Sequence, residues 1–160
     1  MSSNSVLFIC AANTARSIMA EHLLRRELER RGIDGLISVR SAGIAAYARD
    51  GALVSLDTRL VLRDVGIDIG PEATSTDLKR HPELLQSADF VIAMTQQQAH
   101  ELRLKFPEAA GCDVHTLCGF AGEAGDIEDP FEKGDEVFAV CRDRITQLIP
   151  RIADRLLAPR

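Results

Sequence analysis

Apolar and polar positions alternate along the chain in blocks that predict strands separated by helices. Residues 6–10 form a continuous apolar run, which is typical of a strand buried on both faces of a parallel sheet. A short loop over residues 11–16 follows, and apolar residues then recur at helical spacing from Ser17 until Gly32, which predicts an amphipathic helix. Residues 36–41 predict a second strand.

The rest of the chain continues this alternation. Leucines and valines recur at helical spacing over residues 52–65 and predict a second helix. The remaining predicted elements are strands at 90–94 and 114–117 and helices at 96–105 and 137–152, the last with a kink expected at Pro150. Because strands that alternate with helices form right-handed crossovers, the pattern predicts an α/β fold with a parallel sheet covered on both faces.

Length and composition limit the classes of protein to consider. The chain has 160 residues, of which 46% are hydrophobic, and it shows no repeat or linker, so we expect a single domain over residues 1–160. No apolar run approaches the roughly 20 residues of a membrane span, so we expect no membrane association and a cytoplasmic protein. The net charge of −5, from 24 acidic and 19 basic residues, argues against a nucleic-acid partner.

The cysteines show no spacing typical of metal ligands. There are four, without a Cys-x-x-Cys pair and without paired histidines nearby, so no metal site is expected. In a cytoplasmic chain they should be free thiols, each either packed or reactive. They lie at Cys10, Cys112, Cys118 and Cys141.

The loop after the first predicted strand carries the candidate chemistry. A cysteine is followed six residues later by an arginine and then by a serine, in the run Cys10-Ala11-Ala12-Asn13-Thr14-Ala15-Arg16-Ser17. A turn from a strand into a helix points backbone N–H groups inward, where they can hold a phosphate. The positive electrostatic environment of these N–H groups and of the helix N-terminus also favours a nucleophilic thiolate at Cys10. Arg16 can bind two phosphate oxygens, and Ser17 can hydrogen-bond the sulfur.

A second loop, over residues 119–134, supplies candidate acids. Phosphoryl transfer to a cysteine requires a proton for the departing group. Proline fixes the backbone beside Asp129 and would hold that carboxyl group in one direction. Spacing alone leaves open whether the acids of this loop are catalytic or solvated turn residues; they are Glu123, Asp126, Glu128 and Asp129.

Four motifs together resemble the low-molecular-weight protein tyrosine phosphatase family. They are residues 10–17, Met19-Ala20-Glu21, Ser41-Ala42-Gly43 and Asp129-Pro130-Phe131, and the similarity runs from Val6 to about Leu157. The resemblance implies a three-layer, phosphotyrosine phosphatase I-like fold with a central four-stranded parallel sheet flanked by helices. It also implies a phosphoric monoester hydrolase that acts on phosphorylated protein as a monomer or weak dimer, without a cofactor or metal.

The resemblance also implies roles for individual residues. Cys10 would attack phosphorus to form a phosphocysteine, Asp129 would protonate the leaving group and later deprotonate water, and Arg16 would hold the phosphate oxygens. Asn13 would adopt left-handed backbone angles, tied down by Ser17 and Ser41. The implied phosphate- and substrate-binding residues are Ala11, Ala12, Asn13, Thr14, Ala15 and Ser17, with Tyr47 and Phe131 as aromatic walls.

Four positions depart from the family pattern. Ala12 stands where the family usually has glycine, and an alanine would be strained there if the backbone needs positive φ. Ala15 stands where a second cysteine is often found, so Cys10 lacks a neighbouring disulfide partner against over-oxidation. Ile18 stands where the family has proline, and Glu72 occupies a position that is usually histidine.

Three alternatives to a phosphotyrosine phosphatase stay open. A protein arginine phosphatase of the same family is favoured by Thr14, Phe131 and the run 91–95, although phosphotyrosine ranks first as the family's usual substrate and because Tyr47 suits an aryl ring. A non-catalytic module that binds anions or phosphoproteins is suggested by Ala12. A thioredoxin-coupled arsenate reductase needs two more cysteines after the third strand, and residues 94–105 contain none.

Overall fold

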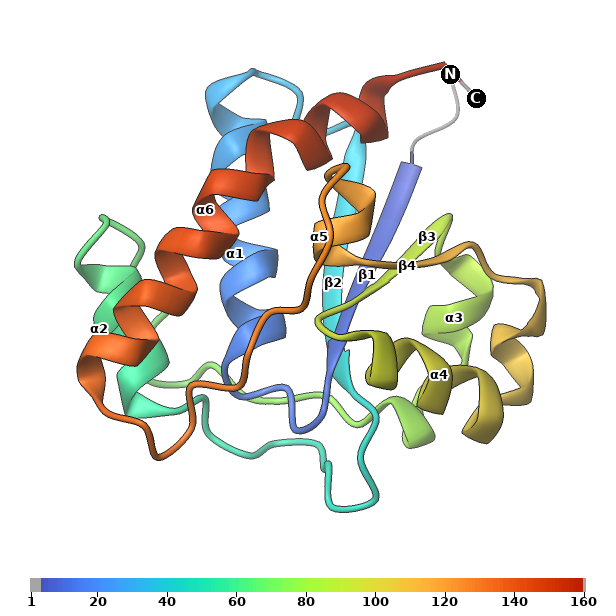
Figure 1. The fold of residues 1–160 in the computed structure, drawn as a ribbon, viewed down its shortest axis with the longest axis horizontal. Coiled ribbons are helices and arrows are strands. Elements are labelled where there is room, and N and C mark those ends of the chain that lie inside the picture. The colour runs from blue at the N-terminus through green and yellow to red at the C-terminus, as the bar shows by residue number, and fades with distance from the viewer. Residues whose placement is uncertain (1–3, 160) are drawn as a thin grey trace.

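Four parallel strands form the centre of the protein (Figure 1). The computed structural model describes residues 4–159. Strand β1 (Asn4–Cys10) lies between β2 (Ile37–Gly43) and β3 (Phe90–Ala93), and β4 (Val114–Thr116) pairs with β3. The sheet order is β2-β1-β3-β4, so the expected four-stranded parallel sheet is confirmed.

Helices cover both faces of the sheet, which confirms the expected three layers. Alternate side chains of β1 enter two separate cores, because successive residues of a strand point to opposite faces. Phe8 packs in one core and Ile9 in the other, and both are fully buried. The first face carries α1 (Arg16–Arg30), α2 (Leu56–Arg63), α5 (Leu117–Phe120) and α6 (Asp135–Leu157); the second carries η1 (Leu78–Arg80), α3 (Glu83–Ser87), α4 (Gln96–Lys105) and η2 (Pro107–Gly111).

The helix predicted over residues 52–65 is shorter in the structure, and most of its expected apolar stripe is not buried. Helix α2 begins only after Ser55, whose side chain accepts the N–H of Thr58 as an N-cap. Leu53 instead forms an isolated antiparallel bridge with Thr74 and is exposed. Pairing with a distant segment therefore overrides the local helical spacing.

Other boundaries differ in smaller ways. Leu117, predicted as the end of a strand, begins α5, which Thr116 caps by accepting the N–H of Gly119. Helix α6 continues on both sides of Pro150.

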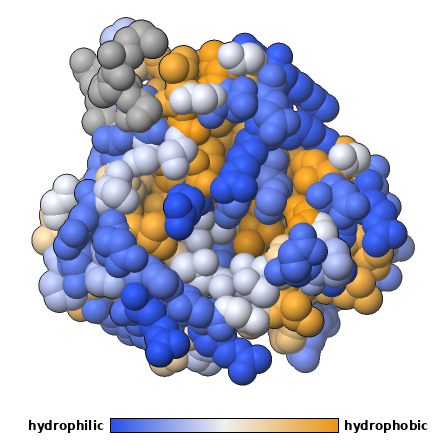
Figure 2. Space-filling view, turned by 180° about the vertical axis from the view of Figure 1, so that it is seen from behind, coloured by the Kyte–Doolittle hydropathy of each residue, from blue (hydrophilic) through white to orange (hydrophobic). Residues whose placement is uncertain are grey.

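The face seen in Figure 2 has hydrophilic side chains over most of its area, with apolar patches between them. Within residues 4–159, no helix has the length and apolar character needed to cross a bilayer.

Strand β2 extends two residues beyond its predicted end and so reaches the loop that follows β1. The N–H groups of Ile44 and Ala45 donate to the carbonyls of Cys10 and Ala11, each at 3.0 Å. This close approach requires glycine at Gly43, since a Cβ there would lie 2.8 Å from the Ala11 oxygen and from the Ala12 carbonyl carbon. The carboxyl ends of β1 and β2 thereby form one edge, at which ligands of parallel α/β sheets bind.

Candidate active site

The thiol of Cys10 lies at the carboxyl end of β1, at the base of a cavity of about 300 Å³. Cys10 is only 3% exposed, and its Sγ lies 2.9 Å from the Ser17 Oγ in the first turn of α1. Ala15 is the N-cap of α1 and contributes no side-chain hydrogen bond there. The cavity is therefore adjoined by a helix N-terminus, where unpaired N–H groups and the positive dipole end favour an anion.

Asn13 is the residue that fixes the shape of the loop. Its φ of 61° lies in the left-handed region, which asparagine tolerates better than most residues. Its Nδ2 donates to the Ser17 Oγ at 2.8 Å and to the Ser41 Oγ at 3.0 Å, and its Oδ1 accepts the N–H of Thr76 at 2.8 Å. The side chain is fully buried, so these three contacts hold the loop against β2 and against the backbone at Thr76.

The backbone strain anticipated at Ala12 is absent. Apart from glycines, only Asn13 and Glu132 among residues 4–159 have positive φ. Ala12 therefore occupies ordinary backbone space and lines the cavity without a conformational penalty. Glu72 is exposed and lies beside Gly70, while the backbone N–H of Thr76 is what contacts Asn13.

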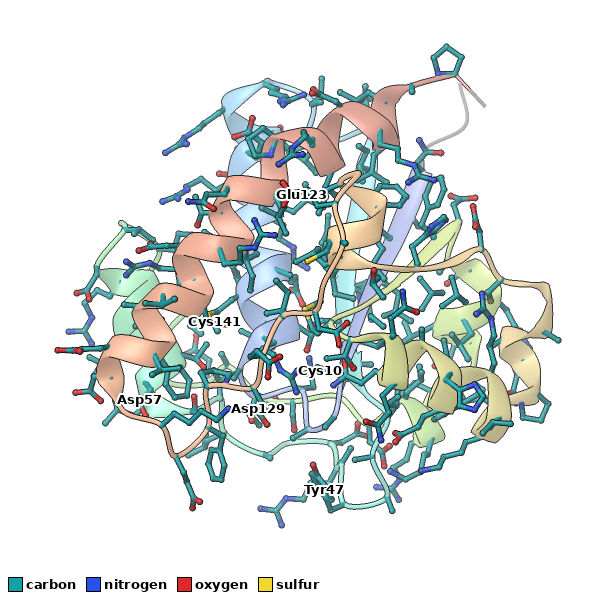
Figure 3. All side chains as sticks on the ribbon, viewed as in Figure 1. Cys10, Tyr47, Asp57, Glu123, Asp129 and Cys141 are labelled. Carbon is teal, nitrogen blue, oxygen red and sulfur yellow. The ribbon has the colours of Figure 1, made fainter. Side chains whose placement is uncertain are left out.

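Arg16 links the loop to the segment that precedes α6. The guanidinium is buried, and its Nη1 donates to the carbonyl of Ile127 at 2.9 Å. Its Nη2 lies 3.7 Å from the Asp129 Oδ2. The Asp129 side chain is 55% exposed, and its Oδ1 accepts the N–H of Phe131 at 3.0 Å across Pro130. In Figure 3, Cys10 and Asp129 lie near the same edge of the sheet although 119 positions separate them in sequence.

Most of the predicted site residues line this single cavity. Tyr47 and Phe131 stand at its mouth, and both are exposed. Asn13, Ser17 and Ser41 lie behind the loop and support it instead. The predicted residues that line the cavity are Cys10, Ala11, Ala12, Thr14, Ala15, Arg16, Tyr47, Asp129 and Phe131.

Two lining residues were missed by the sequence analysis. Ser55, the N-cap of α2, donates its backbone N–H to the Thr14 carbonyl at 3.2 Å, and the Thr58 Oγ1 donates to the same oxygen at 3.1 Å. The serine before an apolar helical stretch is a recognisable N-cap signal, but nothing in the sequence places it beside Thr14. Phe138 of α6 also lines the cavity and carries no signal beyond its helical spacing.

A larger groove adjoins the cavity. Its volume is about 600 Å³, and it shares Ala11, Arg16, Tyr47 and Asp129 with the cavity. Helix α4 forms its far wall with Glu101 and neighbouring polar residues. The cavity is therefore the deep end of a wider surface depression.

The other cysteines are packed residues. Burial raises the pKa of the Cys141 thiol to about 11, although the nearby Arg16 charge lowers it. Burial likewise raises the pKa of Cys112 and of Cys118. Of the four cysteines, only Cys10 lines the cavity. Within the described residues, no three His, Cys, Asp or Glu side chains gather in a way that would hold a metal ion.

Comparison with known proteins identifies the family. The model of the low molecular weight phosphotyrosine protein phosphatase family matches residues 5–159. A protein-arginine-phosphatase of Geobacillus stearothermophilus is 37% identical over 94% of this chain and 95% of its own length, and one of Bacillus subtilis is 32% identical over the same shares. The crystal structure of a low molecular weight protein tyrosine phosphatase from T. tengcongensis is 32% identical, with a TM-score of 0.83 over 95% of this chain and 99% of that one. The chain belongs to this phosphatase family.

Proposed function

We propose that this protein removes phosphate from phosphorylated arginine side chains of proteins, with Cys10 as the nucleophile. The observation that carries the catalytic part is the buried Cys10 Sγ, 2.9 Å from the Ser17 Oγ at the base of a cavity that Arg16 also lines. A thiol in contact with a hydroxyl and a helix N-terminus is well suited to act as a thiolate. Membership of a phosphatase family supports the same conclusion.

In the first step, the Cys10 thiolate attacks phosphorus and a P–S bond forms as the bond to the leaving group breaks. Backbone N–H groups of the loop and the Arg16 guanidinium bind the three remaining phosphate oxygens. Asp129, in its protonated form, gives its proton to the departing atom, which is nitrogen for phosphoarginine and oxygen for phosphotyrosine. The exposed position of its carboxyl group beside the cavity supports this role.

In the second step, water replaces the cysteine. The Asp129 carboxylate takes a proton from the water, whose oxygen attacks phosphorus while the P–S bond breaks and phosphate leaves. Ser17 can stabilise the returning thiolate by donating its hydroxyl hydrogen to the sulfur. Because Asp129 must begin protonated while Cys10 must begin ionised, the rate is expected to fall on both sides of an acidic optimum.

Thr14 is the observation that favours phosphoarginine. It lines the cavity, and the two hydrogen bonds from Ser55 and Thr58 to its carbonyl hold its backbone in place. A hydroxyl on this loop, beside the bound phosphate, can accept a hydrogen bond from the N–H groups of a phosphorylated guanidinium, which an aryl ester lacks. The two arginine phosphatases described above, at 37% and 32% identity, support this choice.

Phosphotyrosine is the second candidate substrate. Tyr47 and Phe131 at the mouth of the cavity offer two aromatic surfaces against which a phenyl ring could stack. The similarity to a tyrosine phosphatase of known structure supports it too. For either substrate, the adjoining groove leaves room for the polypeptide that flanks the phosphorylated residue, which fits a protein substrate handled by one domain over residues 1–160.

The experiment compares two peptides of one sequence that carry either phosphoarginine or phosphotyrosine. The parent protein should have the higher kcat/KM on phosphoarginine. Thr14→Val, which keeps the side-chain shape and removes the hydroxyl, should lower that value by about tenfold, as expected for one lost hydrogen bond to a charged group. Thr14→Ser keeps the hydroxyl and serves as the matched control.

Three outcomes would contradict the proposal. A parent preference for phosphotyrosine would establish the second candidate. Equal losses on both peptides in Thr14→Val would mean that Thr14 does not select the substrate. A parent protein that binds phosphate but releases none, even from p-nitrophenyl phosphate, would be a binding module and not an enzyme.

A further inference from the structure

One face of α1 carries three polar side chains at intervals of four residues. Ser17, Glu21 and Arg25 follow one another at this spacing, so they lie in a row along the helix. On the neighbouring strand β2, Ser41 and Val39 are two residues apart and so face the same side. The two rows are joined by hydrogen bonds, and the row on α1 ends at the sulfur of Cys10.

The contacts between the two rows form one chain. The Ser41 hydroxyl donates to the Glu21 Oε1. The Glu21 Oε2 lies 2.9 Å from the Arg25 Nη2, which also donates to the Val39 carbonyl at 2.6 Å. From Ser41 the chain continues through the Asn13 amide to Ser17 and the Cys10 sulfur.

The direction of each hydrogen bond in this chain follows from its two ends. A backbone N–H can only donate, so the N–H of Thr76 fixes Oδ1 of Asn13 as the acceptor and turns the amide nitrogen toward the serines. Both hydrogens of that nitrogen are then used, one for the Ser17 Oγ and one for the Ser41 Oγ. Each serine oxygen is therefore an acceptor toward Asn13.

At the other end, an ionised carboxylate can only accept. Ser41 therefore gives its single hydrogen to Glu21 and presents a lone pair to Asn13. Ser17 likewise presents a lone pair to Asn13, so its single hydrogen is free for the Cys10 Sγ. This arrangement delivers a hydrogen bond to the sulfur, which stabilises a thiolate more than a thiol.

We propose that Glu21 is a positioning residue that promotes the thiolate form of Cys10 through Ser41, Asn13 and Ser17. Glu21 does not line the cavity, and its carboxylate is held by Arg25 in a largely buried place. By accepting the Ser41 hydrogen, it turns a lone pair of Ser41 toward Asn13. The Asn13 amide is then held with one hydrogen on Ser41 and the other on Ser17, which keeps the Ser17 hydrogen directed at the sulfur. The inference rests on the proposed role of Cys10 as the nucleophile.

The test measures alkylation of Cys10 by iodoacetate across a range of pH, with the modified peptide identified by mass spectrometry. Glu21→Ala should move the midpoint of the alkylation profile upward by about half a unit to one unit, since the Ser17 hydroxyl that donates to the anion is then less firmly oriented. On p-nitrophenyl phosphate, kcat should fall by about threefold to tenfold, with KM within about twofold. Glu21→Gln keeps an oxygen acceptor and should lie between parent and Glu21→Ala.

The matched control is Glu27→Ala. Glu27 of the same helix forms an ion pair with Arg31, the C-cap residue, at the same spacing of four residues, with N and O 2.8 Å apart and away from the loop. It should leave the alkylation profile and kcat unchanged. In a double-mutant cycle, Ser41→Ala should add little to Glu21→Ala, because both break the same chain.

The alkylation assay keeps the test independent of turnover. If Glu21→Ala and Glu27→Ala lower the melting temperature alike and neither moves the alkylation midpoint, Glu21 is only structural and the inference is wrong. If Ser41→Ala and Glu21→Ala add in full, no chain connects them. If the parent alkylates at low pH but hydrolyses no substrate, the proposed function fails while the role of Glu21 can still be read from the midpoint.

Discussion

The two sides of the active site are built very differently. On the nucleophile side, Cys10, Asn13 and Ser17 are buried and joined by hydrogen bonds no longer than 3.0 Å. On the acid side, the Asp129 side chain is 55% exposed. It accepts one hydrogen bond from the backbone N–H of Phe131, and it forms an ion pair with Arg16 at 3.7 Å.

This difference matches what each side has to do. A thiolate and a phosphate cradle must be arranged before the substrate arrives, because dipoles that need no reorganisation stabilise the transition state most. A general acid must instead exchange its proton with solvent and reach leaving groups of different shape. A rigid, buried structure is therefore expected around the Cys10 thiolate and the bound phosphate, and an exposed position is expected for Asp129, which exchanges a proton.

The largest predicted effect tests the rigid side. Cys10→Ser should lower kcat on p-nitrophenyl phosphate by about a thousandfold or more, because a serine hydroxyl has no nearby base to ionise it. The melting temperature should stay near that of the parent, since serine retains the contact with Ser17. Measurable turnover within tenfold of the parent would mean that another group is the nucleophile.

Asp129→Asn tests the exposed side. It should lower kcat by about a hundredfold on a phenyl phosphate with a poor leaving group, which lies in the range of one general acid. The loss should be much smaller on p-nitrophenyl phosphate, because p-nitrophenolate leaves without a proton. Rates would be compared over a series of aryl phosphates of graded leaving-group pKa, and equal slowing across the series would exclude the acid role.

The sequence predicts the rigid side better than the exposed one, for a physical reason. Residues 10–17 are contiguous, and the strand before them and the helix after them are visible in the hydrophobic spacing. The exposed side draws on separate elements, so Asp129 became a specific candidate only through family resemblance. Ser55 and Phe138 were missed because no local pattern indicates which distant segments meet in the cavity.

The same limit explains the error in the fold prediction. Apolar residues do recur at helical spacing over residues 52–65, but Leu53 pairs with Thr74 and the helix begins only after its N-cap, Ser55. Strands β1 and β3 were predictable because each contains a short apolar run that is buried on both faces of the sheet. Strand β2 begins with alternating buried and exposed residues, which is also a strand pattern.

A smaller effect is expected from a substitution that crowds the contact between β2 and the loop after β1, on the rigid side. In Gly43→Ala, the new Cβ would approach the Ala11 oxygen and the Ala12 carbonyl carbon to 2.8 Å, and both are backbone atoms that cannot rotate away. We expect a loss of about 1–3 kcal/mol in the free energy of unfolding, as for other overpacked sites, measured by urea denaturation. Gly35→Ala, where no atom lies within 4 Å, is the control.

The smallest predicted effect concerns the segment that carries Tyr47 on the exposed side. His81 Nε2 lies 2.8 Å from the Asp50 Oδ2, and its Nδ1 lies 3.3 Å from the Glu83 Oε1. The hydrogen bond with Asp50 raises the pKa of His81 above its ordinary 6.5, and the N–H of Asp77, followed by His81, lowers the pKa of Asp50. A raised histidine pKa stabilises the fold fully below 6.5, and this contribution is lost as pH rises through the raised value.

Between pH 6 and pH 9, the parent should therefore lose about a degree more in melting temperature than His81→Gln does, because an exposed pair contributes little. His100→Gln, which removes an exposed histidine of α4, should behave like the parent. If the pair also steadies Tyr47, KM for the phosphopeptide should rise with pH in the parent more than in His81→Gln, while alkylation of Cys10 stays the same in both. A change in alkylation would instead mean that the exposed side is coupled to the rigid one, and the distinction between the two sides would not hold.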